Sequence, residues 1–165
     1  MTLQQYLSYI AYMVNSTEFL FQQIPEEKID WKPTENSFTI GQQLAHMVGA
    51  FEVYARGMTT GDWGVKSMRE RFLQNRRTPS ITVSEAIRLL HANHDEFRRR
   101  IGSLSEEEFL RGELETPQLG GRFPRWRIGM LFIEHHLNHK AELFMYLKLL
   151  GIKVNSGHLY RGGAL

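Results

Sequence analysis

Apolar residues recur along most of this chain at the spacing of an α-helix. In the first stretch they stand three, four or seven positions apart, which places them on one face of a helix. A strand would instead alternate apolar and polar residues, and no segment of useful length does so. Pro25 interrupts the pattern, so we predict a first helix over 3–24. Its apolar face consists of Leu3, Leu7, Ile10, Val14, Phe21 and Ile24.

The second predicted helix begins at a capping-box pattern, in which Thr39 is followed three positions later by Gln42. Asn36 and Ser37 are rival caps one turn earlier. We expect this helix to run to about Arg56, because the next residue is a glycine and glycine favours the end of a helix.

Two more long helices are predicted from the same kinds of signal. Thr82 opens a second capping box, and the apolar spacing after it predicts a helix over 83–101. Pro124 suits the first turn of a helix that continues to Leu150 and stops at Gly151.

The connections between these helices are long. Residues 57–80 are polar, with a short helix predicted over 65–74, and a link of this length suits a crossover between parallel helices. Another short helix is predicted over 105–110. The tail, 152–165, has no helical pattern and is expected to be loose or strand-like at the surface.

These features predict an all-α protein, a four-helix bundle with long crossover connections, in a single domain over 1–165. A chain of 165 residues, 42% of them hydrophobic, is long enough for one core of its own. It has no cysteine, which excludes disulfides, thiolate metal sites and cysteine nucleophiles. Imidazole and carboxylate groups remain as metal ligands.

The charge pattern is typical of a soluble protein that does not bind nucleic acid. The formal net charge is only +2, and the arginine-rich segments 68–77 and 97–100 alternate with apolar residues, as solvated helix faces do. The sequence shows no secretory signal and no apolar stretch long enough for a membrane span. We therefore expect a cytoplasmic protein without a nucleic-acid or membrane partner. A homodimer is plausible for a bundle of this size.

Three histidines are the candidate metal ligands. His135 and His139 are four positions apart, so on a helix their rings can converge on one point. His46 in the second helix can supply a third nitrogen, and Gly49 and Ala50 are small enough to leave a hollow beside it. Three histidines leave one coordination position open, which is typical of a reactive rather than a structural metal.

The other four histidines are weaker candidates for metal ligands. His136 is the rival ligand, but it points about 100° away from His135 on the helix, so we expect it at the surface or at a subunit contact. His94 lies on the apolar stripe of the third helix and is expected to be a core residue, with a fourth ligand or a group supporting the ligands as the alternative. His91 and His158 are expected to face solvent.

Glu142 is the candidate catalytic residue. It follows His135 by seven positions and should lie almost in line with it, on a strip that also includes Phe132 and Leu149 and is expected to face the core. Its carboxylate can orient a ligand imidazole, bind the metal or accept a proton. The alternative is an exposed helix acid.

Two segments, IDWKPTENSFTIGQQLAHM and HHLNHKAELFMYLKLLGIKV, resemble the DinB/YfiT-like superfamily of small metal-binding bundles. The first matches a Trp-x-Pro loop followed by a helix with the family's first histidine, and the second matches its H-x3-H motif. The resemblance implies that His46, His135 and His139 are the metal ligands. Where the family commonly has His-Arg-Gly-Gln, this chain has His139-Lys140-Ala141-Glu142, so a frequent amide is replaced by a carboxylate.

The leading functional hypothesis is a metal-dependent enzyme that carries Zn2+ or Ni2+ on these three histidines. Such a metal would activate water or a low-molecular-weight thiol for attack on a small-molecule substrate, as in a hydrolase or a thiol S-transferase. The alternative is a non-catalytic, metal-binding stress-response bundle. Nucleic-acid binding through the arginines is the third and least favoured hypothesis.

Overall fold

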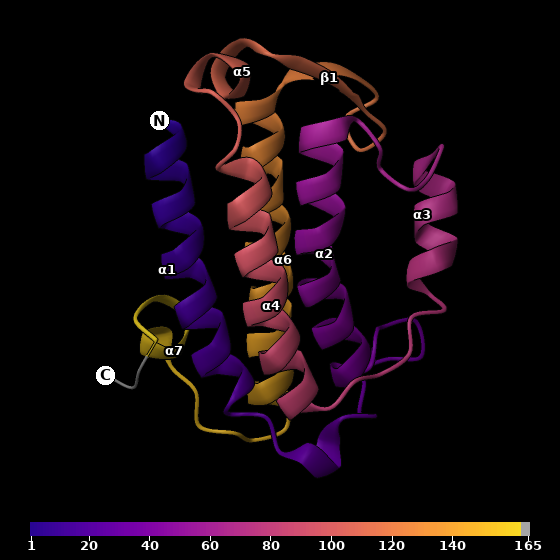
Figure 1. Cartoon of the computed structure of the whole chain (residues 1–165). Helices are drawn as coiled ribbons and strands as arrows, with labels where there is room; N and C mark the ends of the chain where they lie inside the picture. The colour runs from indigo at the N-terminus through magenta and orange to yellow at the C-terminus, as the bar shows by residue number, and fades with distance from the viewer. Residues whose placement is uncertain (163–165) are drawn as a thin grey trace.

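The computed structural model describes residues 1–162. Within them, four long helices lie side by side: α1 (Leu3–Phe21), α2 (Ile40–Thr60), α4 (Val83–Ile101) and α6 (Arg125–Leu149) (Figure 1). Helices α1 and α6 run in one direction, and α2 and α4 run in the other (Figure 1). The segment between the parallel helices α2 and α4 therefore crosses the length of the molecule, as its length predicted, and it contains α3 (Met68–Asn75).

The long helices begin where the local sequence predicts. Thr39 accepts a hydrogen bond from the backbone N–H of Gln42, whose side chain in turn bonds the backbone of Thr39, so the predicted capping box is present. Thr82 caps α4 by accepting from the backbone N–H of Glu85. Pro124 immediately precedes the first residue of α6.

Aromatic side chains from three helices meet at the centre of the core. Phe51 of α2, Phe97 of α4 and Phe132 of α6 are fully buried. Their ring centroids are 4.9 to 5.7 Å apart. Aromatic pairs at this distance stabilise a fold by about 0.5–1.5 kcal/mol each beyond the burial of their surface. This cluster fixes α2 against α6, the two helices that carry the candidate ligands.

Helix α2 is one turn longer than predicted, because the first glycine does not end it. The helix continues to Thr60 and ends at Gly61, whose φ of 78° is the left-handed conformation that glycine favours. Gly57 lies inside the helix, where the ring of Trp63 packs directly on it. A Cβ at this position would be 2.3 Å from the Trp63 ring. Close packing, rather than helix termination, explains this glycine.

A short antiparallel hairpin was not anticipated. Strands β1 (Glu113–Thr116) and β2 (Gly121–Pro124) pair between α5 (Glu106–Arg111) and α6. Each strand has four residues, so neither is long enough to show an alternating pattern. The hairpin forms because a tight turn, with Gly120 at φ 69°, joins two adjacent extended segments.

The tail was predicted to be loose or strand-like over 152–165, and residues 163–165 lie outside the described part of the chain. Within 152–162 the prediction was wrong at 156–160. The tail forms a short helix, α7 (Ser156–Tyr160), which packs on α1 and α6. The buried ammonium of Lys140 holds it in place, donating to the Leu159 carbonyl at 2.5 Å and to the Ser16 hydroxyl at 2.6 Å. These partners are distant in sequence, so no local pattern predicts them.

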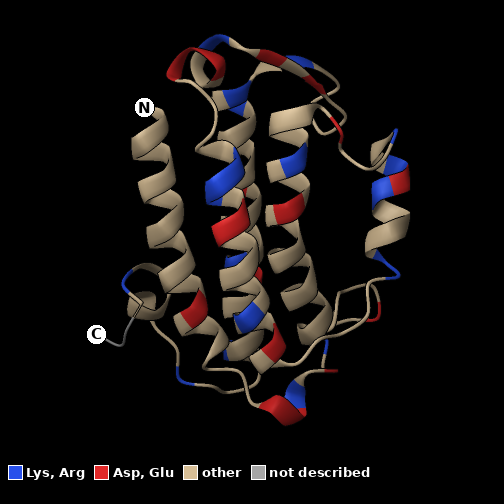
Figure 2. Ribbon diagram, in the orientation of Figure 1, with Lys and Arg blue, Asp and Glu red and all other residues tan. Residues whose placement is uncertain are grey.

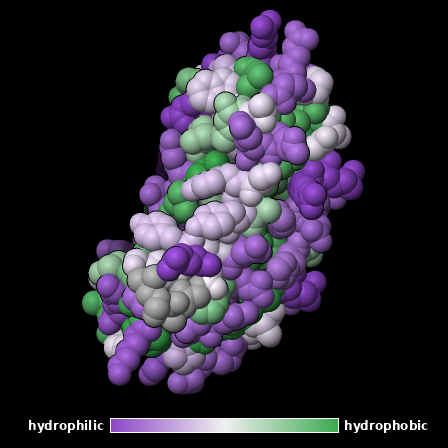
Figure 3. All heavy atoms as spheres, turned by 90° about the vertical axis from the view of Figure 1, so that its left-hand side faces the viewer, coloured by the Kyte–Doolittle hydropathy of each residue, from purple (hydrophilic) through white to green (hydrophobic). Residues whose placement is uncertain are grey.

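Charged residues occur along the helices and in the connections (Figure 2), and most of them are exposed or half-buried. On α4, Arg99 and Arg100 both bind the carboxylate of Glu96. The face on the α1 side is mainly hydrophilic, with hydrophobic residues in small scattered groups (Figure 3). Within residues 1–162, every helix is too short or too polar to cross a lipid bilayer.

Candidate metal centre

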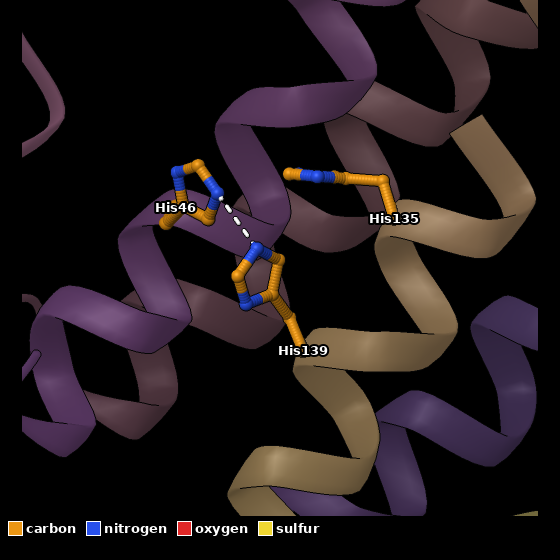
Figure 4. Close-up of side chains that lie close together, drawn as sticks. All are labelled: His46, His135 and His139. Atoms are coloured by element: carbon orange, nitrogen blue, oxygen red, sulfur yellow. Dashed lines mark hydrogen bonds between the residues drawn. The ribbon is translucent and has the colours of Figure 1, made fainter. Parts of the chain in front are cut away.

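Two helices bring the three predicted ligands together. His46 projects from α2, and His135 and His139 project from successive turns of α6 toward it (Figure 4). The ring centroids are 4.5 to 4.9 Å apart. One nitrogen from each ring lies within 4.8 Å of the other two, so three ring nitrogens face a common point. Residues 89 to 93 positions apart in sequence thus form one cluster, which we call the histidine cluster.

Burial keeps the imidazoles of His46 and His135 uncharged at neutral pH. Desolvation is the main cause that lowers the pKa of His46 to about 4 and that of His135 to about 3. Their neighbours in the cluster lower both values further, since adjacent cations would repel. A neutral imidazole has one nitrogen lone pair free for a metal, whereas a protonated one has none.

Glu142 orients His139. Its Oε2 lies 2.7 Å from Nδ1 of His139 and also accepts a hydrogen bond of 2.8 Å from the amide of Gln43. Since an ionised carboxylate only accepts, Nδ1 of His139 carries the proton, and the lone pair lies on Nε2. That Nε2 is 3.1 Å from Nε2 of His46 and therefore faces the cluster. The hydrogen bond from His139 lowers the pKa of Glu142.

Glu142 thus contacts one of the predicted ligand imidazoles, though not the one that its spacing aligned it with. The prediction placed it in line with His135, seven positions earlier, but it bonds His139, three positions earlier. Gln43 was the residue that the sequence reasoning missed. It lies one turn before His46 on α2 and reaches across to α6, a contact that only the packing of the two helices creates.

The predicted orientation of α6 is correct at Phe132, which is fully buried, but wrong further along the helix. His136 is fully buried, not at the surface, and its Nε2 lies 2.9 Å from the hydroxyl of Thr17. The buried face of the helix is centred on His136 and Lys140, while Leu149 of the predicted core strip is 63% exposed. His135 and His139 therefore lie at the edge of the core, about 100° around the helix from its centre, where they face α2.

The other histidines lie outside the cluster. His94 is half-buried beside the Phe51 ring, with centroids 6.2 Å apart. His91 is exposed and lies 3.0 Å from the carboxylate of Glu18, so its predicted exposure is confirmed. His158 is buried in α7, which contradicts the prediction that it faces solvent. Its ring is tilted against that of Phe19, with the centroids 5.3 Å apart.

A cavity of about 550 Å³ opens beside the histidine cluster. We call it the histidine cavity. The predicted hollow at Gly49 is present, since a Cβ added there would meet no atom within 4 Å. Helix α3 supplies the opposite wall, which the sequence analysis did not foresee. Residues lining the cavity include His46, His135, His139, Phe38, Val53, Met68, Arg71 and Phe72.

The donor set fits a divalent transition metal. Three imidazoles from two helices are ligands that Zn2+, Ni2+ and Cu2+ accept, and a carboxylate behind one of them is the usual support for such a ligand. The cluster also borders an open cavity, so a fourth ligand can approach from that side. The geometry therefore describes a site that could hold a metal ion.

Comparison with known proteins shows which family the whole chain resembles. A family model described as the DinB family matches residues 1–160. The chain belongs to the DinB family. The resemblance seen in the two sequence segments is thereby confirmed.

Another DinB-like protein shows the same fold. The uncharacterized protein YjoA of Bacillus subtilis (strain 168) is 24% identical over 148 residues, which cover 89% of this chain and 90% of YjoA. The crystal structure of the DinB-like YjoA of Bacillus subtilis superimposes with a TM-score of 0.69 at 21% identity, covering 91% of this chain and 94% of that one. The similarity supports the fold and says nothing of a substrate.

Proposed function

We propose that this DinB-family protein is a metal-dependent enzyme whose metal is held by His46, His135 and His139. The observation that carries the proposal is the convergence of three imidazole nitrogens on one point in the wall of a cavity. A purely structural site would be closed by a fourth protein ligand. The metal is Zn2+ or Ni2+, since both accept imidazole ligands.

The substrate is a small molecule that enters the histidine cavity. Zn2+ or Ni2+ bound by the histidines would supply a positive charge that lowers the pKa of water or of a low-molecular-weight thiol. The reaction is then a hydrolysis or the transfer of a thiol to an electrophile. The apolar wall formed by Phe38, Val53 and Phe72 would exclude bulk water from the reacting groups.

Glu142 acts in this proposal by positioning a ligand. Its Oε2 already accepts from His139 and Gln43, and its lowered pKa makes it a weak proton acceptor at neutral pH. The carboxylate holds His139 with Nε2 directed toward the metal. A general-base role for Glu142 is the alternative, and the pH dependence of the rate distinguishes the two, because a base in the reaction would show its own pKa in that profile.

We also assign the four long helices to one crossover four-helix-bundle domain, because α2 contacts both α4 and α6, and α1 contacts both of these as well. A homodimer, a cytoplasmic location and the lack of a nucleic-acid partner remain predictions.

Metal analysis of untagged protein tests the proposal. We expect about one equivalent of Zn2+ or Ni2+ in the wild type and less than about a tenth in His46→Ala, since two histidines alone bind weakly. His91→Ala is the matched control because His91 is exposed and lies outside the cluster. Wild-type protein that stays metal-free after reconstitution would refute the metal site.

Activity assays distinguish a metal-dependent enzyme from a non-catalytic metal-binding bundle. The metal-loaded wild type should turn over at least one pair from a panel of thiols and electrophiles or hydrolysable esters, and His46→Ala should not. Metal that raises the melting temperature while no member of the panel reacts would favour the non-catalytic metal-binding bundle.

A further inference from the structure

The histidine cavity contains a cation as well as the three histidines. Arg71 belongs to α3, which stands beside the four long helices and next to α2 (Figure 1). Its side chain lines the same cavity as His46 and His135. The cavity therefore has a metal-ligand cluster and a guanidinium in its walls.

The guanidinium of Arg71 is only partly satisfied. Nη1 donates to the side chain of Gln74 at 3.3 Å, and Nη2 donates to the carbonyl of Trp63. Nε is buried and has no hydrogen-bond partner among residues 1–162. Within those residues no carboxylate lies within 4.0 Å of the guanidinium. A buried donor without a partner is unfavourable, and an arginine stays charged, so this group can accept an anion.

The nearby acids are already bound to other groups. Glu52 also lines the cavity, but its Oε1 lies 3.4 Å from Nη1 of Arg56. Glu70 accepts a hydrogen bond of 2.9 Å from the backbone N–H of Lys66. Arg56 is close enough to Arg71 to lower its pKa, second only to burial. Glu70, Tyr54 and Glu52 act on Arg71 in the opposite direction and raise its pKa, so groups of both signs surround the guanidinium.

The rest of the cavity wall is largely apolar. Phe38, Val53, Met68 and Phe72 supply carbon surface between α2 and α3. An apolar body bound here would lie between the cation and the histidine cluster. A single guanidinium matches the single charge of a carboxylate, whereas a phosphate carries about two negative charges and usually binds several donors.

We propose that the histidine cavity recognises a small molecule with a carboxylate on an apolar body, and that Arg71 binds the carboxylate. Binding of the carboxylate by Arg71 does not require a metal. The assignment rests on the proposed function only for the other end of the molecule, which would face the reactive metal. Arg71 is then a specificity-determining residue that orients the substrate. The class of substrate is an amphipathic carboxylic acid.

The test compares two ligands that differ in charge and little in shape. Binding of 4-phenylbutanoate and 4-phenylbutanamide to the full-length protein is measured by NMR titration. The wild type should bind the carboxylate about tenfold more tightly than the amide, because a charge-assisted bond is stronger than a neutral one. Arg71→Met should reduce this ratio to about one, and Arg69→Met, on the exposed side of α3, should leave it unchanged.

Two further measurements complete the test. Arg71→Gln retains a polar side chain and replaces Arg71→Met if that variant fails to fold. It should also lose the preference for the carboxylate over the amide. Titrations before and after chelation separate this inference from the metal site. A preference that depends on Arg71 in metal-free protein supports the inference even if no metal binds. An equal affinity for both ligands in the wild type, or a preference that survives in both Arg71 variants, overturns it.

Discussion

Buried neutral His136 should make the protein sensitive to acid. Burial lowers its pKa from 6.5 to about 3, and its Nε2 lies 2.9 Å from the Thr17 hydroxyl. In the unfolded chain the ring takes up a proton below about pH 6.5, while in the folded protein it stays neutral down to about pH 3. The unfolded state thus binds more protons in this window. The stability that the neutral His136 contributes is therefore complete above pH 6.5, and it is lost as the pH falls toward 3.

The size of the effect follows from the shift in pKa. At pH 5, 1.5 units below 6.5, the loss from this one histidine is about 2 kcal/mol, at about 1.36 kcal/mol per unit. His136→Gln removes the titrating ring but keeps a donor for the Thr17 hydroxyl. The variant should be less stable than the wild type at pH 7, and the difference should shrink by about 2 kcal/mol between pH 6.5 and pH 5.

Urea unfolding of metal-free protein at half-unit steps from pH 4.5 to pH 8 measures this difference directly. His91→Gln is the control, because His91 is exposed, and its difference from the wild type should stay small. A stability difference between wild type and His136→Gln that does not change with pH would refute the reasoning. In that case the ring would take up its proton in the folded protein at the same pH as in the unfolded chain.

Three other predictions concern the metal site and the packing of α2. Glu142→Gln should weaken Zn2+ binding about 10- to 100-fold in a chelator competition titration, because His139 loses its charged support, whereas Glu134→Gln, also on α6, should have little effect. Gly57→Ala should lower the free energy of unfolding by about 1–3 kcal/mol, since its Cβ would overlap the Trp63 ring, while Gly49→Ala should not destabilise, because nothing lies within 4 Å. Thermal unfolding compares the two. Removing the metal with a chelator should lower the Tm of the wild type but not that of His46→Ala; Zn2+ at about 100 times its Kd stabilises by about 2.7 kcal/mol.

The helices themselves could be predicted because their signals are local. Capping residues and apolar spacing act within a few positions of Thr39 or Thr82, and the structure begins helices at both. Two of the three clustered histidines could be paired by the same local logic, since residues four apart share a helix face. His46 came from residue type and family resemblance, and the structure brings it to the other two.

The wrong predictions share one cause, because each concerns a feature that contacts between distant segments decide. Gly57 looked like a helix stop because the sequence does not show that Trp63 packs on it. The tail looked unstructured because the anchor of α7 is Lys140, on another helix.

The sequence alone determined where the four long helices lie and which side chains can bind a metal, because hydrogen bonds within a helix and the chemistry of imidazole are both local. Only the tertiary structure decided which face of α6 is buried, that Gln43 and Glu142 support His139, and that α3 places Arg71 in the wall of the histidine cavity. A rotation of α6 by about 100° would exchange the roles of His135 and His136, and nothing within the helix sets that angle. It is set by the side chains of the other helices that pack against it.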